Sequence, residues 1–92
     1  MAWYSAAMAS GQVLISDCKQ HLLETMRALP ECAPDGTGLG NKAIEDATGF
    51  ALGLERADGW FTWSLLVALA NEGAVEVLQP GKRNKKYRLT SR

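Results

Sequence analysis

The feature that most constrains the fold of this chain is a change in the spacing of its apolar residues at Gly73. Before this glycine, apolar residues recur at steps of three and four, which predicts a helix over about 59–72. After it, Val75 and Val77 alternate with Glu76, and this period of two is typical of a strand. Because glycine often ends a helix in a left-handed conformation, the sequence predicts that the helix stops at Gly73 and leads directly into a strand.

A second strand is predicted after a short turn. Pro80 and Gly81 begin a turn rich in Lys, Arg and Asn, and Tyr87 and Leu89 then alternate with basic and polar residues. Two alternating runs around such a turn predict an antiparallel hairpin at about 74–90. A hairpin is marginally stable alone in water, so we expect its apolar face to pack on the preceding helix while its basic turn points into solvent.

A first helix is expected at about 17–29, because Asp17 can cap its N-terminus and Pro30 would end it. Its apolar face consists of residues spaced by three and four: Ile15, Cys18, Leu22, Met26 and Leu29. Residues 31–40 contain several glycines and prolines and are expected to form a loop. Residues 1–14 are an N-terminal extension that either continues this helix or forms a dimer seam.

A second, shorter helix is expected at about 41–52. We predict that Ile44, Ala47 and Ala51 are buried, and that three charged residues of the same helix face water: Lys42, Glu45 and Asp46. A turn then leads to Asp58, a good N-cap for the third helix. With 92 residues, of which 47 % are hydrophobic and 22 % charged, the chain suits one small folded domain at 15–92 rather than a disordered segment.

The net charge of zero conceals a strong asymmetry along the chain. Residues 1–80 contain four Lys and Arg and ten Asp and Glu, a net charge of −6, whereas residues 81–92 contain six Lys and Arg and no acid, a net charge of +6. A local concentration of positive charge favours a polyanion as partner, because the local potential steers association. The alternative is a solvated basic tail that only aids solubility.

The segment LLVALANEGAVEVLQPGKRNKKYRLT, from Leu65 to Thr90, resembles the winged helix-turn-helix family. A leucine-rich helix end, an acidic residue and a glycine are followed by a valine-containing strand, a basic wing and a strand ending in Tyr-Arg-Leu-Thr. The resemblance implies an α+β fold, a three-helix bundle with a C-terminal two-stranded β-hairpin wing. It also implies binding of double-stranded DNA, with the third helix in the major groove and the wing on the backbone or in the minor groove.

The candidate DNA-binding residues come from the third helix and the wing: Thr62, Trp63, Ser64, Val67, Lys82, Arg83, Asn84, Lys85, Lys86 and Arg88. Cations on the wing can neutralise phosphates and release counterions, which makes affinity depend steeply on salt. Asn84 either contacts DNA or serves the turn, since Asn tolerates a positive φ. No Lys or Arg lies between Asp58 and Gly73, so we expect a weakly specific contact dominated by the wing.

A second hypothesis is a module for protein interaction or assembly. Trp60, Phe61 and Trp63 fall within four residues, and one helix cannot point all three inward. We therefore expect at least one exposed tryptophan, a residue type that is enriched at the centres of protein interfaces. Trp3 and Tyr4 either add to such a surface, form a dimer seam or close the open side of the core.

An enzyme is not expected. His21 is the sole histidine, and although Cys18 lies one helical turn before it, a nucleophilic pair would also need an oxyanion site and an orienting group. The spacing of Cys18 and Cys32 fits neither a metal site nor a redox motif, so we expect reduced thiols and no metal or cofactor. No apolar run is long enough to span a membrane. The expectation is a cytoplasmic homodimer, nucleoid-associated if bacterial or archaeal, that acts in transcription regulation or targets a larger complex to DNA.

Overall fold

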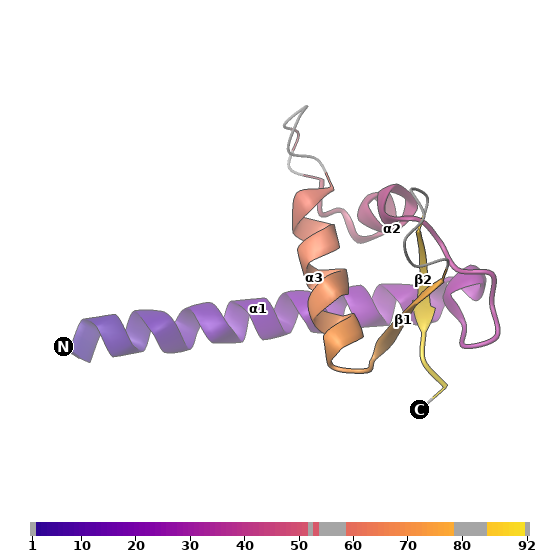
Figure 1. Cartoon of the computed structure of the whole chain (residues 1–92). Coiled ribbons are helices and arrows are strands. Elements are labelled where there is room, and N and C mark those ends of the chain that lie inside the picture. Colours follow the sequence, from indigo (N-terminus) through magenta and orange to yellow (C-terminus); the bar gives the residue numbers. More distant parts are fainter. Residues whose placement is uncertain (1, 52, 54–58, 79–84, 92) are drawn as a thin grey trace.

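The computed structural model describes residues 2–51, 53, 59–78 and 85–91. Its elements follow in the order α1 (Ala2–Ala28), η1 (Pro30–Cys32), α2 (Asn41–Thr48), α3 (Trp60–Asn71), β1 (Val75–Leu78) and β2 (Lys86–Leu89) (Figure 1). Three α-helices followed by a two-stranded antiparallel hairpin confirm the predicted α+β class. Within these residues, no helix combines the length and the apolar character needed to cross a membrane.

Helix α1 is much longer than predicted, because it begins at Ala2 rather than near Asp17. Asp17 therefore lies inside the helix and does not cap it. Residues 2–16 include four alanines, one glycine and no proline, so nothing in this stretch breaks a helix that has formed. The N-terminal extension thus continues α1, and its first half projects away from the rest of the protein (Figure 1). The side chains of Trp3 and Tyr4 lie outside the described part of the structure.

The core lies where the second half of α1 meets the other elements. Its buried apolar side chains are Leu22, Met26, Cys32, Ile44, Leu65, Leu66, Leu69, Val75 and Tyr87. Cys18 and Leu29 pack against this cluster, as the predicted apolar face requires. Ile15 does not, because it lies in the part of α1 that projects beyond the body and is 46 % exposed. Both Cys18 and Cys32 are free thiols.

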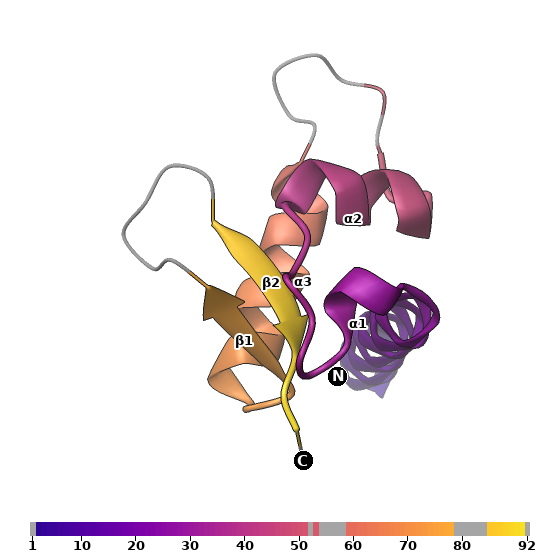
Figure 2. The ribbon, with the colours of Figure 1, turned by 90° about the vertical axis from the view of Figure 1, so that its right-hand side faces the viewer.

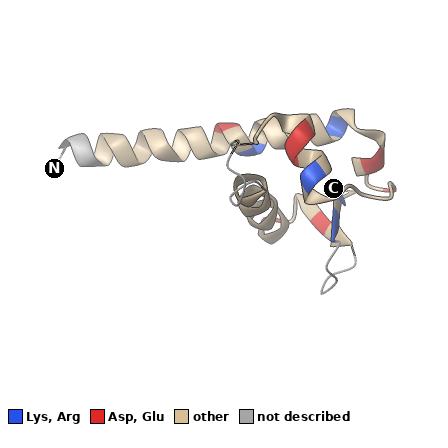
Figure 3. Ribbon diagram, turned by 90° about the horizontal axis from the view of Figure 1, so that it is seen from above, with Lys and Arg blue, Asp and Glu red and all other residues tan. Residues whose placement is uncertain are grey.

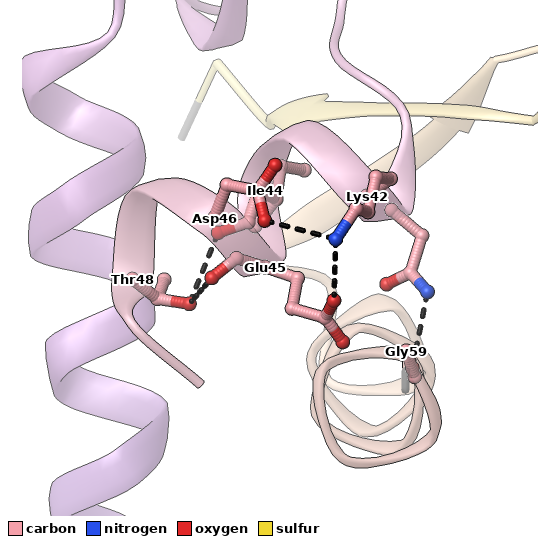
Figure 4. Close-up of polar contacts among 7 residues, drawn as sticks. Lys42, Ile44, Glu45, Asp46, Thr48 and Gly59 are labelled. Atoms are coloured by element: carbon pink, nitrogen blue, oxygen red, sulfur yellow. Dashed lines mark hydrogen bonds and ion pairs between the residues drawn. The ribbon is translucent and has the colours of Figure 1, made fainter. Parts of the chain in front are cut away.

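Helix α2 shows a different buried face from the predicted one. It ends at Thr48, where Gly49 adopts a left-handed conformation with φ 77°, so Ala51 lies beyond the helix and is exposed. Ala47 is also exposed, whereas Glu45, predicted to face water, is only 1 % exposed. Glu45 is buried because it points from α2 toward the start of α3 (Figure 4). A β-carbon placed on Gly59, the residue before α3, would lie 3.8 Å from Glu45 Oε2.

The change of period at Gly73 corresponds to a sharp stop of α3. Gly73 has φ 82°, and its N–H donates to the Ala70 carbonyl at 3.1 Å. The N–H of Ala74 donates to the Leu69 carbonyl at 2.9 Å. Together these bonds form a Schellman motif, the helix ending for which glycine is the favoured residue. The left-handed glycine predicted at this position is thus confirmed, and the chain enters β1 two residues later. Asp58, the predicted N-cap of α3, lies outside the described residues.

The hairpin pairs Val75 with Leu89 at one end and Leu78 with Lys86 at the other. A third segment joins it, because Leu39 and Tyr87 form an isolated antiparallel bridge. Figure 2 shows the chain between η1 and α2 running beside β2. This bridge places the N-terminus of α2 next to the beginning of β2.

Candidate nucleic-acid interface

The exposed face of α3 is almost free of charge and carries two large aromatic rings. Trp60 is 65 % exposed and Trp63 is 44 % exposed, and their rings meet edge to face with centroids 6.1 Å apart. Ser64 and Val67 share this face, as predicted. The Ser64 hydroxyl donates to the Trp60 carbonyl at 2.8 Å, so its proton is used within the helix. At least one exposed tryptophan was expected on this helix, and the structure shows two, Trp60 and Trp63.

Thr62 was predicted to face solvent on α3 as a candidate DNA contact, and the structure contradicts this exposure. Its side chain is fully buried, because it lies on the face of α3 that also holds Leu65, Leu66 and Leu69. Within the described residues its hydroxyl has no hydrogen-bond partner. Thr62 thus belongs to the core face of the helix and is removed from the candidate site.

Two wing lysines lie at the beginning of β2 and are exposed. Lys85 and Lys86 have no ion-pair partner within the part of the chain that the structure describes. Lys82, Arg83 and Asn84, the other predicted wing residues, lie outside the described residues. Two of the five predicted wing-tip residues can therefore be placed.

Arg88 was also a candidate DNA-binding residue, but in the structure its guanidinium is engaged in contacts within the protein. It lies directly across the hairpin from Glu76, and its Nε donates to the Glu76 carboxylate. Its Nη1 donates to the Gly36 carbonyl at 2.8 Å. Since the charge is compensated and two donors are used, Arg88 ties β2 to β1 and to the preceding loop.

The site includes a third lysine, Lys42, which the sequence did not indicate. Lys42, in the first turn of α2, lines one hollow together with the two wing lysines and Trp63; its lining is Gly40, Asn41, Lys42, Trp63, Lys85, Lys86 and Tyr87. The Leu39–Tyr87 bridge creates this juxtaposition, since it brings the start of α2 to the start of β2. Spacing along the chain cannot reveal it, because the contact is between residues more than forty positions apart.

The charge of Lys42 is balanced by its own helix. Its Nζ lies 3.1 Å from Asp46 Oδ1 and 3.5 Å from Glu45 Oε1 (Figure 4). The hydrogen bond and the charge of Asp46 raise the pKa of Lys42 above its ordinary value, so the side chain stays protonated. The two carboxylate oxygens of Glu45 have no hydrogen-bond partner among the described residues. Asn41 Nδ2 donates to the Gly59 carbonyl at 3.0 Å, which joins the starts of α2 and α3.

Trp63 is the common member of three neighbouring hollows. The first is the lysine-bordered hollow, and the second is lined by Asn41, Gly59, Trp60 and Trp63. The third lies between α3 and the hairpin and includes Val67 and Lys85. An exposed indole with lysines beside it can pack on a sugar or base while the ammonium groups pair with phosphates. The arrangement is therefore suited to a polyanion that also presents apolar or aromatic surface.

His21, the one histidine of the chain, makes contacts between helices. His21 Nε2 donates to the Thr48 carbonyl at 2.9 Å, and its ring packs against Phe50 with centroids 5.3 Å apart. His21 thus joins α1 to the end of α2. Among the described residues, no cluster of three His, Cys, Asp or Glu side chains could hold a metal ion.

Comparison with protein-family models, with curated proteins and with solved structures finds no match to this chain. The function is therefore inferred from the geometry of the described residues.

Proposed function

We propose that this protein binds double-stranded DNA through the surface formed by Trp63, Lys85, Lys86 and the start of α2. One observation carries the proposal: the fold places Lys85 and Lys86, which have no ion-pair partner among the described residues, beside the exposed Trp63 and the start of α2. Phosphate contacts from lysines supply affinity without sequence information, and they make that affinity salt-dependent.

The arrangement of helices and hairpin supports a winged helix-turn-helix layout for this function. In that layout α3 enters the major groove, and its exposed face offers Trp63, Ser64 and Val67 to base edges or thymine methyl groups. In the same layout the hairpin, with Lys85 and Lys86, contacts the sugar-phosphate backbone of the DNA. Since α3 has no cation, we propose that it adds little specificity and that the wing supplies most of the affinity. Such a protein would act in the cytoplasm as a transcription regulator or as the DNA-targeting module of a larger complex.

Titration of a labelled mixed-sequence duplex, followed by fluorescence anisotropy at low and near-physiological salt, tests the proposal. We expect binding at low salt that weakens steeply as salt rises. Changing Lys82, Arg83, Lys85 and Lys86 together to Ala should abolish it. No binding at low salt, where electrostatic attraction is strongest, would reject the proposal.

A second candidate function is protein interaction through the exposed Trp60–Trp63 pair. The observation that favours it is the large, uncharged aromatic surface on α3. Trp63→Ala separates the two functions. A DNA contact predicts weaker duplex binding, whereas a protein interface predicts unchanged duplex binding and altered assembly with the partner.

A further inference from the structure

The first half of α1 is an uncharged helical arm, which we define as residues 2–16. No Asp, Glu, Lys or Arg occurs in it, and the charged residues of the protein all lie in the rest of the chain (Figure 3). The arm projects from the body (Figure 1). Four of its described apolar side chains are about half exposed or more: Met8, Val13, Leu14 and Ile15.

Such an arm is poorly suited to stand alone in water. Isolated helices shorter than about 12–15 residues are marginal even with alanine-rich sequences, and most helix stability in proteins comes from packing of an apolar face. Without charged residues, the arm also lacks ion pairs between successive turns. Its helical state therefore calls for a partner surface.

The arm extends the core-facing stripe of α1 beyond the body. Met8, Gly11, Ile15, Cys18 and Leu22 follow one another at alternating steps of three and four, the spacing of a seam between two helices. In the body this stripe is covered, since Leu22 is fully buried and Cys18 packs against the core. In the arm the same stripe is open. Around Gly11 there is free space where a side chain would be, so a second helix can approach closely.

We propose that a second copy of this chain covers the arm, with the two arms packed as antiparallel helices about a two-fold axis near Gly11. An uncharged surface can face itself without like-charge repulsion and without burying an unpaired charge, which is what an isologous contact requires. Residues 1–80 have a net charge of −6 although the arm has none, so the bodies are acidic apart from their wings. Antiparallel packing keeps the two bodies at opposite ends and reduces their repulsion. This interface is separate from the proposed DNA-binding surface and does not depend on it.

Sedimentation equilibrium of the full chain across the micromolar range tests the interface. We expect the wild type to be a dimer. In the double variant Met8→Glu/Ile15→Glu, the association constant of the dimer should fall by at least about tenfold. The matched control is Ala9→Glu/Ser16→Glu, which adds the same two charges at the same spacing on another side of the arm and should remain dimeric. A monomeric wild type, or equal loss in both variants, would overturn the proposal.

The orientation of the arms is tested by oxidative cross-linking of single cysteine substitutions. Near the two-fold axis, Gly11→Cys should form an intermolecular disulfide, whereas Ile15→Cys should not, because antiparallel packing moves the two copies of that position apart. The wild type reports any cross-linking through Cys18. Cross-linking at both positions would show parallel arms, and cross-linking at neither would contradict pairing at this stripe. Because neither substitution adds charge, this test does not depend on the folding of the Glu variants.

Discussion

Leu39 and Tyr87 exchange two backbone hydrogen bonds, from Leu39 N–H to the Tyr87 carbonyl at 3.0 Å and from Tyr87 N–H to the Leu39 carbonyl at 2.8 Å. This pair is an isolated antiparallel bridge that holds the segment before α2 beside β2. It fixes Lys42 and the wing lysines on one surface, although the chain between them includes all of α3. The proposed binding surface therefore depends on this backbone pair as much as on the lysines themselves.

The chain packs closely against the hairpin at Gly38, the residue before Leu39, so we predict that stability is sensitive to substitution of this glycine. Gly38 has φ 82°, and a β-carbon there would lie 2.9 Å from Leu78 Cδ1 and 3.1 Å from Lys86 Cβ. Gly49 has φ 77° with nothing within 4 Å, so Gly49→Ala is the matched control. We expect Gly49→Ala to lower the free energy of unfolding by about 1–2 kcal/mol through backbone strain alone. Gly38→Ala should cost a further 1–3 kcal/mol, roughly, through overpacking. Equal losses in urea unfolding would contradict the close contact.

The buried Thr62 hydroxyl predicts a stabilising substitution. Burying a hydroxyl without a hydrogen bond costs about 1–3 kcal/mol in protein data. Thr62→Val keeps the shape of the side chain and removes this cost, so the free energy of unfolding should rise by about 1 kcal/mol. Duplex binding should be unchanged, because Thr62 does not reach the surface. Ser64→Ala, on the exposed face, should leave stability within about 0.5 kcal/mol. Weaker DNA binding by a folded Thr62→Val variant would restore Thr62 as a contact.

Arg88 is predicted to stabilise the hairpin rather than to bind phosphate. Arg88→Ala removes the cross-strand pair with Glu76 and the bond to the Gly36 carbonyl. We expect a loss of about 1–2 kcal/mol of unfolding free energy. Glu76→Gln should reproduce part of this loss. Under conditions where the variants remain folded, Arg88→Ala should change duplex affinity much less than Lys85→Ala does. An equal loss of affinity would show that the Arg88 side chain leaves Glu76 to contact DNA.

The buried Cys32 thiol predicts alkaline destabilisation. Burial raises the pKa of Cys32 from 9.0 to about 11, and the nearby charge of Glu31 adds to the effect. Below pH 9 the thiol is neutral in the folded and unfolded chains, so its contribution is fully present. Between pH 9 and about 11 the unfolded chain releases this proton first, and the free energy of unfolding therefore falls as pH rises.

Urea unfolding from pH 8 upward measures this loss, with Cys32→Ala as the comparison. Burial also raises the pKa of Tyr87, so part of the alkaline loss should persist in the variant. The difference between wild type and Cys32→Ala should shrink as pH rises through this range. A difference that is constant with pH would contradict the raised pKa.

The sequence predicts those parts of this fold that local signals determine. The stop of α3 at Gly73 and the hairpin after it follow from a glycine and a change of period, and both are present. The start of α1 is ambiguous in the sequence, because Asp17 resembles a cap while the alanine-rich stretch before it contains no helix breaker, and the structure shows the earlier start at Ala2. Local signals thus define where an element can end better than where it must begin.

The site was harder to predict because its geometry depends on long-range packing. Thr62 and Glu45 are polar residues that the sequence assigned to water, and both are buried. Glu45 points from α2 toward the start of α3, a contact between helices that the sequence does not indicate. Lys42 reaches the wing only through the Leu39–Tyr87 bridge, which has no pattern in the sequence. Lys85 and Lys86 were predicted correctly as exposed, since a run of cations in a turn is rarely buried.

The most direct test of the central claim is the salt dependence of duplex binding by single-lysine variants. Lys85→Ala and Lys42→Ala remove cations from the proposed surface, whereas Arg27→Ala removes an exposed cation from the far end of α1. The slope of log K against log salt changes by about 0.9 for each phosphate that the protein no longer neutralises. We predict a slope shallower by about that amount for Lys85→Ala, weaker binding for Lys42→Ala, and wild-type behaviour for Arg27→Ala. Equal slopes for Lys85→Ala and Arg27→Ala would contradict a binding surface at Trp63 and the wing.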